Sequence, residues 1–195
     1  MKTTKDISIA SNWIREGKVI AYPTEGIWGL GGLNTPEIIK AIDLIKKRPT
    51  DKKYILLFPF CSPHLQIKKW PNYNKLIDLI KNKFKDEYKI IVAPGPDEIN
   101  MTKEINAISI LKENRSLDIS ELATLIKDSS FVVANDTGPA HIAAHLDTKG
   151  LALFGSHTTA YKVSIERENF KAIQVTDLNK LSPEKVFEYF IKSLN

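Results

Sequence analysis

The sequence has only one cysteine, Cys61, among its 195 residues. A single thiol cannot build a disulfide framework or a cysteine-based zinc site, and such a chain suits a reducing compartment. No apolar run approaches the roughly 18 residues that a membrane-spanning helix needs. Residues 1–15 lack the apolar stretch of a signal peptide. We therefore expect a cytoplasmic protein with no transmembrane segment.

The charge of the chain does not point to one class of partner. The formal net charge is +5, but the lysines are spread along the sequence with acids between many of them. Nucleic-acid surfaces concentrate their cations on a patch or stripe and add aromatic residues for stacking. We therefore expect a lysine-rich surface and no nucleic-acid partner. The 43% hydrophobic and 26% charged residues are typical of a folded globular chain.

Apolar runs and amphipathic stretches alternate along the sequence. Strands alternating with helices favour a parallel sheet covered on both faces, hence an α/β fold. A short α/β segment with a glycine-rich turn at 23–32 precedes this pattern. Strands are expected at 19–22, 54–59, 88–93, 107–111, 131–134, 151–154 and 171–175, and helices at 6–16, 36–47, 73–84, 118–127, 139–146 and 182–194.

The segment Phe131–His141 reads as a strand, a tight polar turn and the start of a helix, with Pro139 suited to the first helical position. The free amides of such a helix lie at the carboxyl end of the strand, where open α/β sheets bind ligands. With the helix dipole they form a site best suited to phosphate. Gly138 would let a ligand approach the backbone, Thr137 could donate a hydroxyl, and His141 could face the same anion. The alternative is that the turn merely caps a buried helix.

A second loop strengthens the phosphate interpretation. Residues 151–159 again place a glycine, Gly155, and hydroxyl side chains directly after an apolar strand. Two neighbouring strand ends with hydrogen-bond donors predict a diphosphate site. His141 and His145 have the four-residue spacing of a metal pair, but they lack the glutamate of the His-Glu-x-x-His pattern. We therefore expect no metal.

Several short segments of the longer part form a specific pattern. They include a Lys-x-Trp-Pro stretch, a Gly-x-x-Glu turn, a helix similar to Ser-Leu-x-Glu-Leu-Ala and the Asp-Thr-Gly turn. In chain order they are Leu57–Pro59, Lys68–Pro71, Val92–Glu98, Leu117–Ala123, Asn135–His141 and Leu153–Gly155. With these segments, residues 54–195 resemble the carboxy-terminal half of family-nine glycosyltransferases, the ADP-heptose:lipopolysaccharide heptosyltransferase type.

The resemblance implies a Rossmann-like domain, one half of a two-domain glycosyltransferase, that binds a nucleoside-diphosphate sugar. In this domain Lys68 would contact the phosphates and Glu98 would take the ribose hydroxyls. Thr137, Gly138 and the amides near them would hold the diphosphate. Such a site stabilises the departing nucleoside diphosphate as its charge grows. The implied donor-binding residues are Lys68, Glu98, Asp136, Thr137, Gly138, Pro139, His141 and Gly155.

The resemblance also implies what the chain would work with. The donor would be similar to ADP-heptose, the acceptor a lipid-linked saccharide, and the setting envelope or lipopolysaccharide synthesis, with the inner membrane as an attachment surface. No further cofactor is expected. Only about fifty residues precede the donor half, so an acceptor domain of normal size is missing. No general base can be named, and turnover stays open.

The first residues carry a different pattern. Ile9–Ala10, Gly17–Glu25, Gly29–Gly31 and Ile45–Pro49 resemble the start of the threonylcarbamoyl-AMP synthase, or YrdC-like, family, which uses threonine, bicarbonate and ATP in transfer-RNA modification. In the resemblance Thr24 lines the substrate site, while Lys46 and Arg48 meet phosphate or carboxylate groups; the alternative is an exposed helix end.

The later part of that family is absent, so the chain reads as a junction of two partial families. We predict a YrdC-like segment over residues 1–53 and a nucleotide-sugar-binding domain over residues 54–195. Three hypotheses follow: a glycosyltransferase-type protein, a threonylcarbamoyl-AMP synthase relative, and a non-catalytic nucleotide-binding or structural remnant. The sequence does not decide whether the junction is a natural fusion, an engineered chimera or a joined gene product.

Overall fold

The computed structural model describes all residues except 1–3, 24–27, 34, 36–52 and 195. The chain forms two compact units, residues 1–51 and residues 52–195. Three residues of the alternative site, Thr24, Lys46 and Arg48, lie outside the described residues, as does the helix expected at 36–47.

The described part of the first unit contains one helix and a two-stranded sheet. Helix α1, Ile7–Arg15, begins after Asp6, whose carboxylate accepts a hydrogen bond from the Ser8 amide at 2.8 Å. Strands β1, Ile20–Pro23, and β2, Trp28–Gly31, pair in antiparallel register. The sequence predicted α1 and β1 but treated the region of β2 as a turn. That prediction was wrong, because pairing with β1 satisfies the backbone of a glycine-rich segment that has no strand signal of its own.

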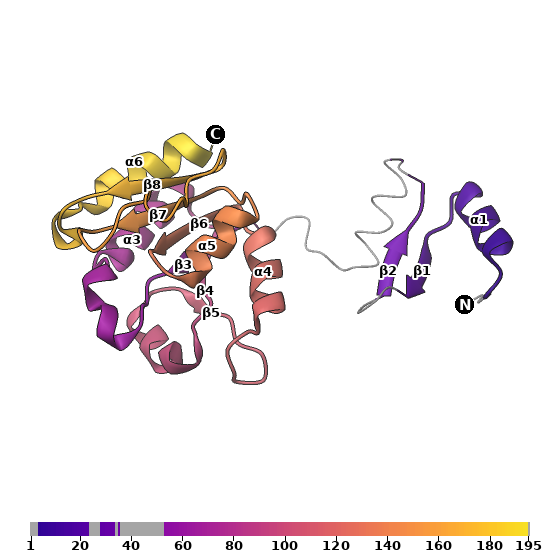
Figure 1. The fold of residues 1–195 in the computed structure, drawn as a ribbon, viewed down its shortest axis with the longest axis horizontal. Helices are drawn as coiled ribbons and strands as arrows, with labels where there is room; N and C mark the ends of the chain where they lie inside the picture. The colour runs from indigo at the N-terminus through magenta and orange to yellow at the C-terminus, as the bar shows by residue number, and fades with distance from the viewer. Residues whose placement is uncertain (1–3, 24–27, 34, 36–52, 195) are drawn as a thin grey trace. The chain divides into compact units, whose positions relative to one another are not determined.

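The second unit is built on a six-stranded parallel sheet (Figure 1). Every strand pair in it is parallel. Counted from β3 as the first strand, the order β5-β4-β3-β6-β7-β8 becomes 3-2-1-4-5-6, the order of a Rossmann fold. The strands are β3 Tyr54–Phe58, β4 Lys89–Val92, β5 Ile108–Ser109, β6 Phe131–Asn135, β7 Gly150–Phe154 and β8 Phe170–Gln174.

Helices cover both faces of this sheet. Helices α3, Tyr73–Phe84, and α6, Pro183–Leu194, pack on one face, and α4, Ile119–Lys127, and α5, Gly138–His145, pack on the other. Successive strand residues point to opposite faces, so β3, β4, β6, β7 and β8 each supply residues to both cores. The four central strands β3, β4, β6 and β7 are almost entirely buried, apolar runs, as is usual in parallel sheets, whereas the edge strands β5 and β8 are partly exposed. The expected α/β, Rossmann-like fold is confirmed.

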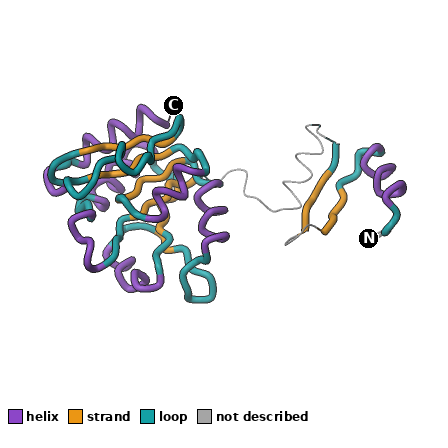
Figure 2. Tube along the Cα trace, in the orientation of Figure 1, coloured by secondary structure: helices purple, strands orange, loops and turns teal. Residues whose placement is uncertain are grey.

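Three short 3-10 helices complete the second unit: η1 Pro63–Lys68, η2 Pro96–Glu104 and η3 Leu178–Lys180. Such turns have no long periodicity, so the apolar pattern did not predict them. Figure 2 shows these helical turns among the loops that join the strands. η1 follows β3 and η2 follows β4, at the carboxyl edge of the sheet.

The strand order creates a switch point between β3 and β6. From β3 the chain crosses to β4 on one side, and from β6 it crosses to β7 on the other. In open α/β sheets the crevice between two such diverging connections is where ligands bind. Lys68 follows β3 and Asp136 follows β6, so the fold brings both to this crevice. No helix among the described residues has the length and apolar character to cross a membrane.

Candidate functional site

Asp136 is the centre of a charged cluster at the switch point. Its side chain is 4% exposed, and Lys68 Nζ lies 2.8 Å from its Oδ2. His157 Nε2 lies 2.9 Å from the same oxygen, and His141 Nε2 lies 3.4 Å from Oδ1. Lys68 Nζ also donates to the Asp136 main-chain oxygen at 3.3 Å. Three connections therefore meet here: the η1 segment, the β6–α5 turn and the loop after β7.

The contacts of Asp136 keep its carboxyl ionised. Burial works to raise the pKa of Asp136, but hydrogen bonds from Lys68 and His157 outweigh it and hold the pKa below its ordinary value. A carboxylate oxygen offers only lone pairs, so Lys68 and His157 both act as donors to it. Asp136 balances much of the charge of Lys68, so an additional anion beside this lysine also needs donors from other groups.

Asn135 and its hydrogen-bond partners support the same corner, and we call this set of contacts the brace. It is fully buried, and its Oδ1 accepts from the Trp70 amide and from the Tyr73 hydroxyl, both at 3.2 Å. Its Nδ2 donates to the Pro59 carbonyl at 3.0 Å. The Trp70 indole in turn donates to the Leu181 carbonyl at 2.9 Å. This network fixes the chain two residues beyond Lys68, so the lysine stem starts from a rigid support.

The start of α5 opens onto free space. Thr137 is the N-cap in extended conformation, and its hydroxyl donates to the Asn135 carbonyl at 3.3 Å instead of capping the helix. Pro139 lies in the first turn and has no amide hydrogen to donate. Gly138 is exposed, and a Cβ added there would meet no atom within 4 Å. Because the Ala140 amide already donates to the Thr137 carbonyl at 3.0 Å, the open helix N-terminus offers an anion chiefly the Gly138 amide and the helix dipole.

Two further residues of the expected donor set lie on neighbouring strand ends. Glu98 follows β4, is half-buried, and accepts from the Gly95 amide through Oε2 at 2.8 Å, which leaves Oε1 for another partner. Gly155 follows β7 but is buried, and a Cβ there would stand 3.4 Å from Leu178 Cγ. The structure thus brings Lys68 and the residues 136–139 and 141 together, and places Gly155 in a supporting position.

The sequence reasoning missed two residues of this corner as site residues. His157 reaches Asp136 although it lies 21 positions away. Asn135 supports the corner through three hydrogen bonds of its side chain, to Trp70, Tyr73 and Pro59. A histidine in the glycine loop after a buried strand was the available signal for His157. Nothing in the sequence alone shows which distant carboxylate it meets.

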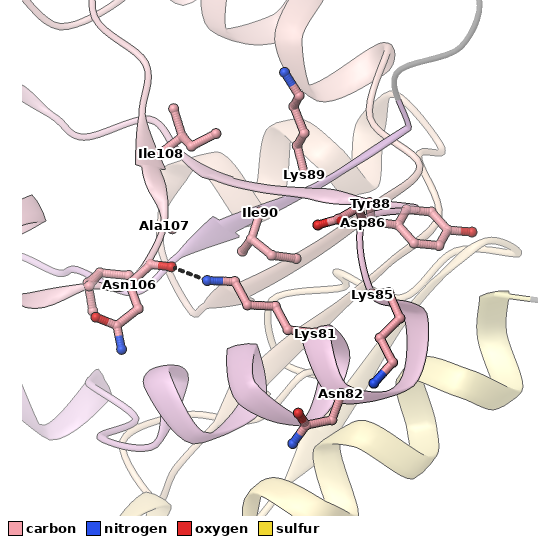
Figure 3. A pocket seen from close by; sticks show the side chains of 11 residues that line it. Lys81, Asn82, Lys85, Asp86, Tyr88, Lys89, Ile90, Asn106, Ala107 and Ile108 are labelled. Atoms are coloured by element: carbon pink, nitrogen blue, oxygen red, sulfur yellow. Dashed lines mark hydrogen bonds between the residues drawn. The ribbon is translucent and has the colours of Figure 1, made fainter.

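A separate hollow lies at the opposite edge of the sheet. Its volume is about 630 Å³, within the usual range for a ligand cavity. Lys81, Lys85 and Lys89 contribute to its lining, and Lys81 Nζ donates to the Asn106 carbonyl at 3.1 Å (Figure 3). It surrounds the amino-terminal ends of β4 and β5, so it is distinct from the Asp136 cluster at the carboxyl ends. We name it the lysine groove.

Several solved structures that share this fold are named as glycosyltransferases, and others as UDP-N-acetylglucosamine 2-epimerases. The E. coli heptosyltransferase WaaC with ADP matches with a TM-score of 0.63 and 19% identity, over 84% of this chain and 52% of that one. E. coli ADP-heptose lps heptosyltransferase II matches with a TM-score of 0.63 and 17% identity, over 89% and 55%. A family 9 glycosyltransferase from Veillonella parvula gives 0.61 and 15%, over 80% and 51%. The chain thus spans about half of each.

Curated relatives give a second similarity over part of the chain. The threonylcarbamoyl-AMP synthase of Cellvibrio japonicus is 37% identical over 92 residues, 46% of this chain and 43% of that protein. The enzyme of the same name from Vibrio vulnificus is 41% identical over 58 residues, 28% of this chain and 31% of that protein. The chain therefore spans less than half the length of these relatives.

One family model matches most of the chain. The model of "Glycosyltransferase family 9 (heptosyltransferase)" matches residues 18–185. This range contains the whole charged cluster, the brace and the start of α5. The chain therefore belongs to glycosyltransferase family 9, the heptosyltransferase family.

Proposed function

We propose that this chain binds a nucleoside-diphosphate sugar, similar to ADP-heptose, at the corner formed by Asp136 and the start of α5, for glycosyl transfer in envelope or lipopolysaccharide synthesis. The observation that carries the proposal is the meeting of Lys68, Asp136 and the open N-terminus of α5 at the switch point of the sheet. Family membership supports the reaction class, and the chemistry of the site supports the ligand class.

In this proposal the diphosphate lies on the first turn of α5. The amides near Gly138 and the helix dipole supply the positive field, because Asp136 already balances the charge of Lys68. Lys68 approaches one side of the phosphates with an orientation fixed by Asp136. Glu98 takes the ribose hydroxyls through its remaining oxygen. This arrangement stabilises the leaving nucleoside diphosphate as the glycosidic bond breaks.

The domain assignment is part of the proposal. Residues 54–195 form the nucleotide-sugar-binding domain, and residues 1–53 form a YrdC-like segment. Because the chain spans about half of the heptosyltransferases that it resembles, a lipid-linked saccharide acceptor and a general base need a second domain or chain. We therefore assign donor binding to this chain and leave catalytic residues unassigned.

Calorimetric titration tests the proposal. The wild-type protein is titrated with ADP, UDP, GDP and an ADP-sugar, and we expect saturable binding of at least one of them. Lys68→Ala should weaken that binding about tenfold or more, since a charged partner of the phosphates is lost. Lys81→Ala in the lysine groove is the matched control and should bind as wild type. Absence of heat with every nucleotide, in a folded sample, would contradict the proposal.

A second candidate function rests on the 37–41% identity to threonylcarbamoyl-AMP synthases over part of the chain. It predicts pyrophosphate release from ATP in the presence of threonine and bicarbonate. A variant carrying both Lys46→Ala and Arg48→Ala should lose this activity, and unchanged turnover would count against it. Nucleotide binding with neither pyrophosphate release nor glycosyl transfer would support the third hypothesis, a non-catalytic remnant.

A further inference from the structure

His157 is placed by the fold at the centre of the donor site. Its side chain is 9% exposed, and its Nε2 lies 2.9 Å from Asp136 Oδ2. Its ring stacks on Phe154 at an interplanar angle of 13°. Its Nδ1 is buried and has no hydrogen-bond partner among the described residues. Among the described residues, the hydrogen bonding of the His157 ring therefore goes through Nε2 alone.

The chemistry of that contact fixes which nitrogen holds the proton. Asp136 Oδ2 is an acceptor and already receives a hydrogen bond from Lys68 Nζ at 2.8 Å. His157 Nε2 must then donate, since two acceptors would repel each other. A proton on Nδ1 as well would leave a buried N–H group unsatisfied, which is costly. The environment thus favours the tautomer with hydrogen on Nε2.

The loop that carries His157 is itself held in place. Gln174, the last residue of β8, donates to the Gly155 carbonyl at 2.6 Å and to the Thr158 carbonyl at 3.1 Å. Its Oε1 accepts from the Ala160 amide at 3.2 Å. These three bonds bracket His157 on both sides. The imidazole therefore approaches Asp136 from a fixed direction, whereas the lysine arrives on a flexible four-carbon stem.

We propose that His157 is a positioning residue for the donor site: it fixes the Asp136 carboxylate, and through it the Lys68 ammonium, in the orientation that meets the diphosphate. The inference rests on the proposed function. Without His157, the carboxylate would be held only by Lys68 at Oδ2 and by the longer, 3.4 Å contact of His141 at Oδ1, so it could turn about its side-chain bond and shift the ammonium. With two donors on one oxygen and His141 at the other, the carboxylate has one orientation.

The test compares two substitutions. His157→Phe keeps an aromatic ring on Phe154 but removes the donor, and His157→Gln keeps a donor that can reach Asp136. His145→Phe is the matched control, because His145 is exposed on α5 and its Nδ1 contacts the His141 carbonyl of the same helix. Thermal unfolding checks that each variant is folded.

Two readouts separate positioning from mere structural support. The pKa of Asp136, followed by carboxyl carbon NMR, should rise in His157→Phe and return toward the wild-type value in His157→Gln. The affinity for ADP should fall about tenfold in His157→Phe, the loss of one hydrogen bond to a charged group, and should be largely restored in His157→Gln.

The outcomes are distinguishable. An unchanged Asp136 titration in folded His157→Phe, or ADP binding equal to wild type, overturns the positioning role. A loss that His157→Gln fails to restore, or that His145→Phe reproduces, also overturns it. Wild-type protein that binds no nucleotide overturns the proposed function instead, whatever the histidine does to the carboxylate.

Discussion

Lys68 Nζ and Asp136 Oδ2 lie 2.8 Å apart, although 68 positions separate the two residues along the chain. The pair joins the segment after β3 to the turn after β6, across the switch point of the sheet. Asp136 is almost fully buried and Lys68 is 22% exposed, so solvent screens the pair only partly. The pair therefore holds the two loops of the proposed donor site together and presents the lysine beside the N-terminus of α5.

Asp136→Asn should make the stability of the protein less dependent on acid. The folded-state pKa of Asp136 lies below its ordinary value of 3.8, so the ionised carboxyl stabilises the fold above about pH 4, and this contribution is lost as pH falls through the folded pKa. We expect the variant to lose about 1–3 kcal/mol of unfolding free energy at pH 7. Urea denaturation at pH 7 and below pH 4 measures this difference in unfolding free energy between wild type and variant. A difference of the same size at both pH values would contradict the account.

Gly138→Ala should affect the ligand and not the fold. An added Cβ meets no protein atom within 4 Å, and the backbone there is not in the left-handed region that favours glycine. We expect an unfolding free energy within about 0.5 kcal/mol of wild type. Binding of ADP should be clearly weaker, because the added methyl group would stand where, in the proposed function, the diphosphate approaches the Gly138 amide. Unfolding and calorimetry on the same sample check this. If the variant bound ADP with the affinity of wild type, the phosphates could not bind at the start of α5 as proposed.

Gly150→Ala, unlike Gly138→Ala, should destabilise the fold. A Cβ at the start of β7 would lie 2.5 Å from Phe170 Cε2 and 2.9 Å from the Val132 carbonyl oxygen. Since one of these contacts is backbone of the neighbouring strand, the sheet must distort, and we expect a loss of about 1–3 kcal/mol. Thermal or urea unfolding measures the loss, with Gly138→Ala as the same substitution in open space. Equal stabilities of the two variants would contradict the packing described.

Asn135→Ala should destabilise the corner by about 2–4 kcal/mol, because the Trp70 amide and the Pro59 carbonyl are left unpaired in a buried place. Asn82→Ala is the control, since Asn82 is exposed at the end of α3 and its loss should change stability by less than about 0.5 kcal/mol. Urea denaturation compares them. A variant at Asn135 as stable as the control would show that the brace contributes little.

The elements with a local cause were predictable from the sequence. The buried runs of β3, β6 and β7 and the apolar face of α3 appear in the sequence as they appear in the structure. The polar turn between β6 and α5 was also predictable, because Pro139 and Gly138 mark a helix start directly after a buried strand. Strand β2 was not, because its glycines carry no strand signal and only pairing with β1 defines it.

The charged cluster depended on contacts that no local pattern encodes. Lys68 ends a 3-10 helix, and its path to Asp136 depends on Trp70 being held by Asn135 and Leu181. His157 lies in a loop shaped by Gln174 from the next strand. Those bonds arise from packing between distant segments, so the residues were visible in the sequence but their convergence was not.

The most direct test of the central claim is to map ADP on the protein by amide NMR. The account predicts that ADP shifts the signals of Thr137, Gly138 and His141 at the start of α5, together with Lys68–Trp70. Resonances around Lys81 and Lys85 of the lysine groove should stay in place. Shifts confined to the lysine groove, or no shifts at saturating ADP, would contradict the claim that the diphosphate binds at the Asp136 corner.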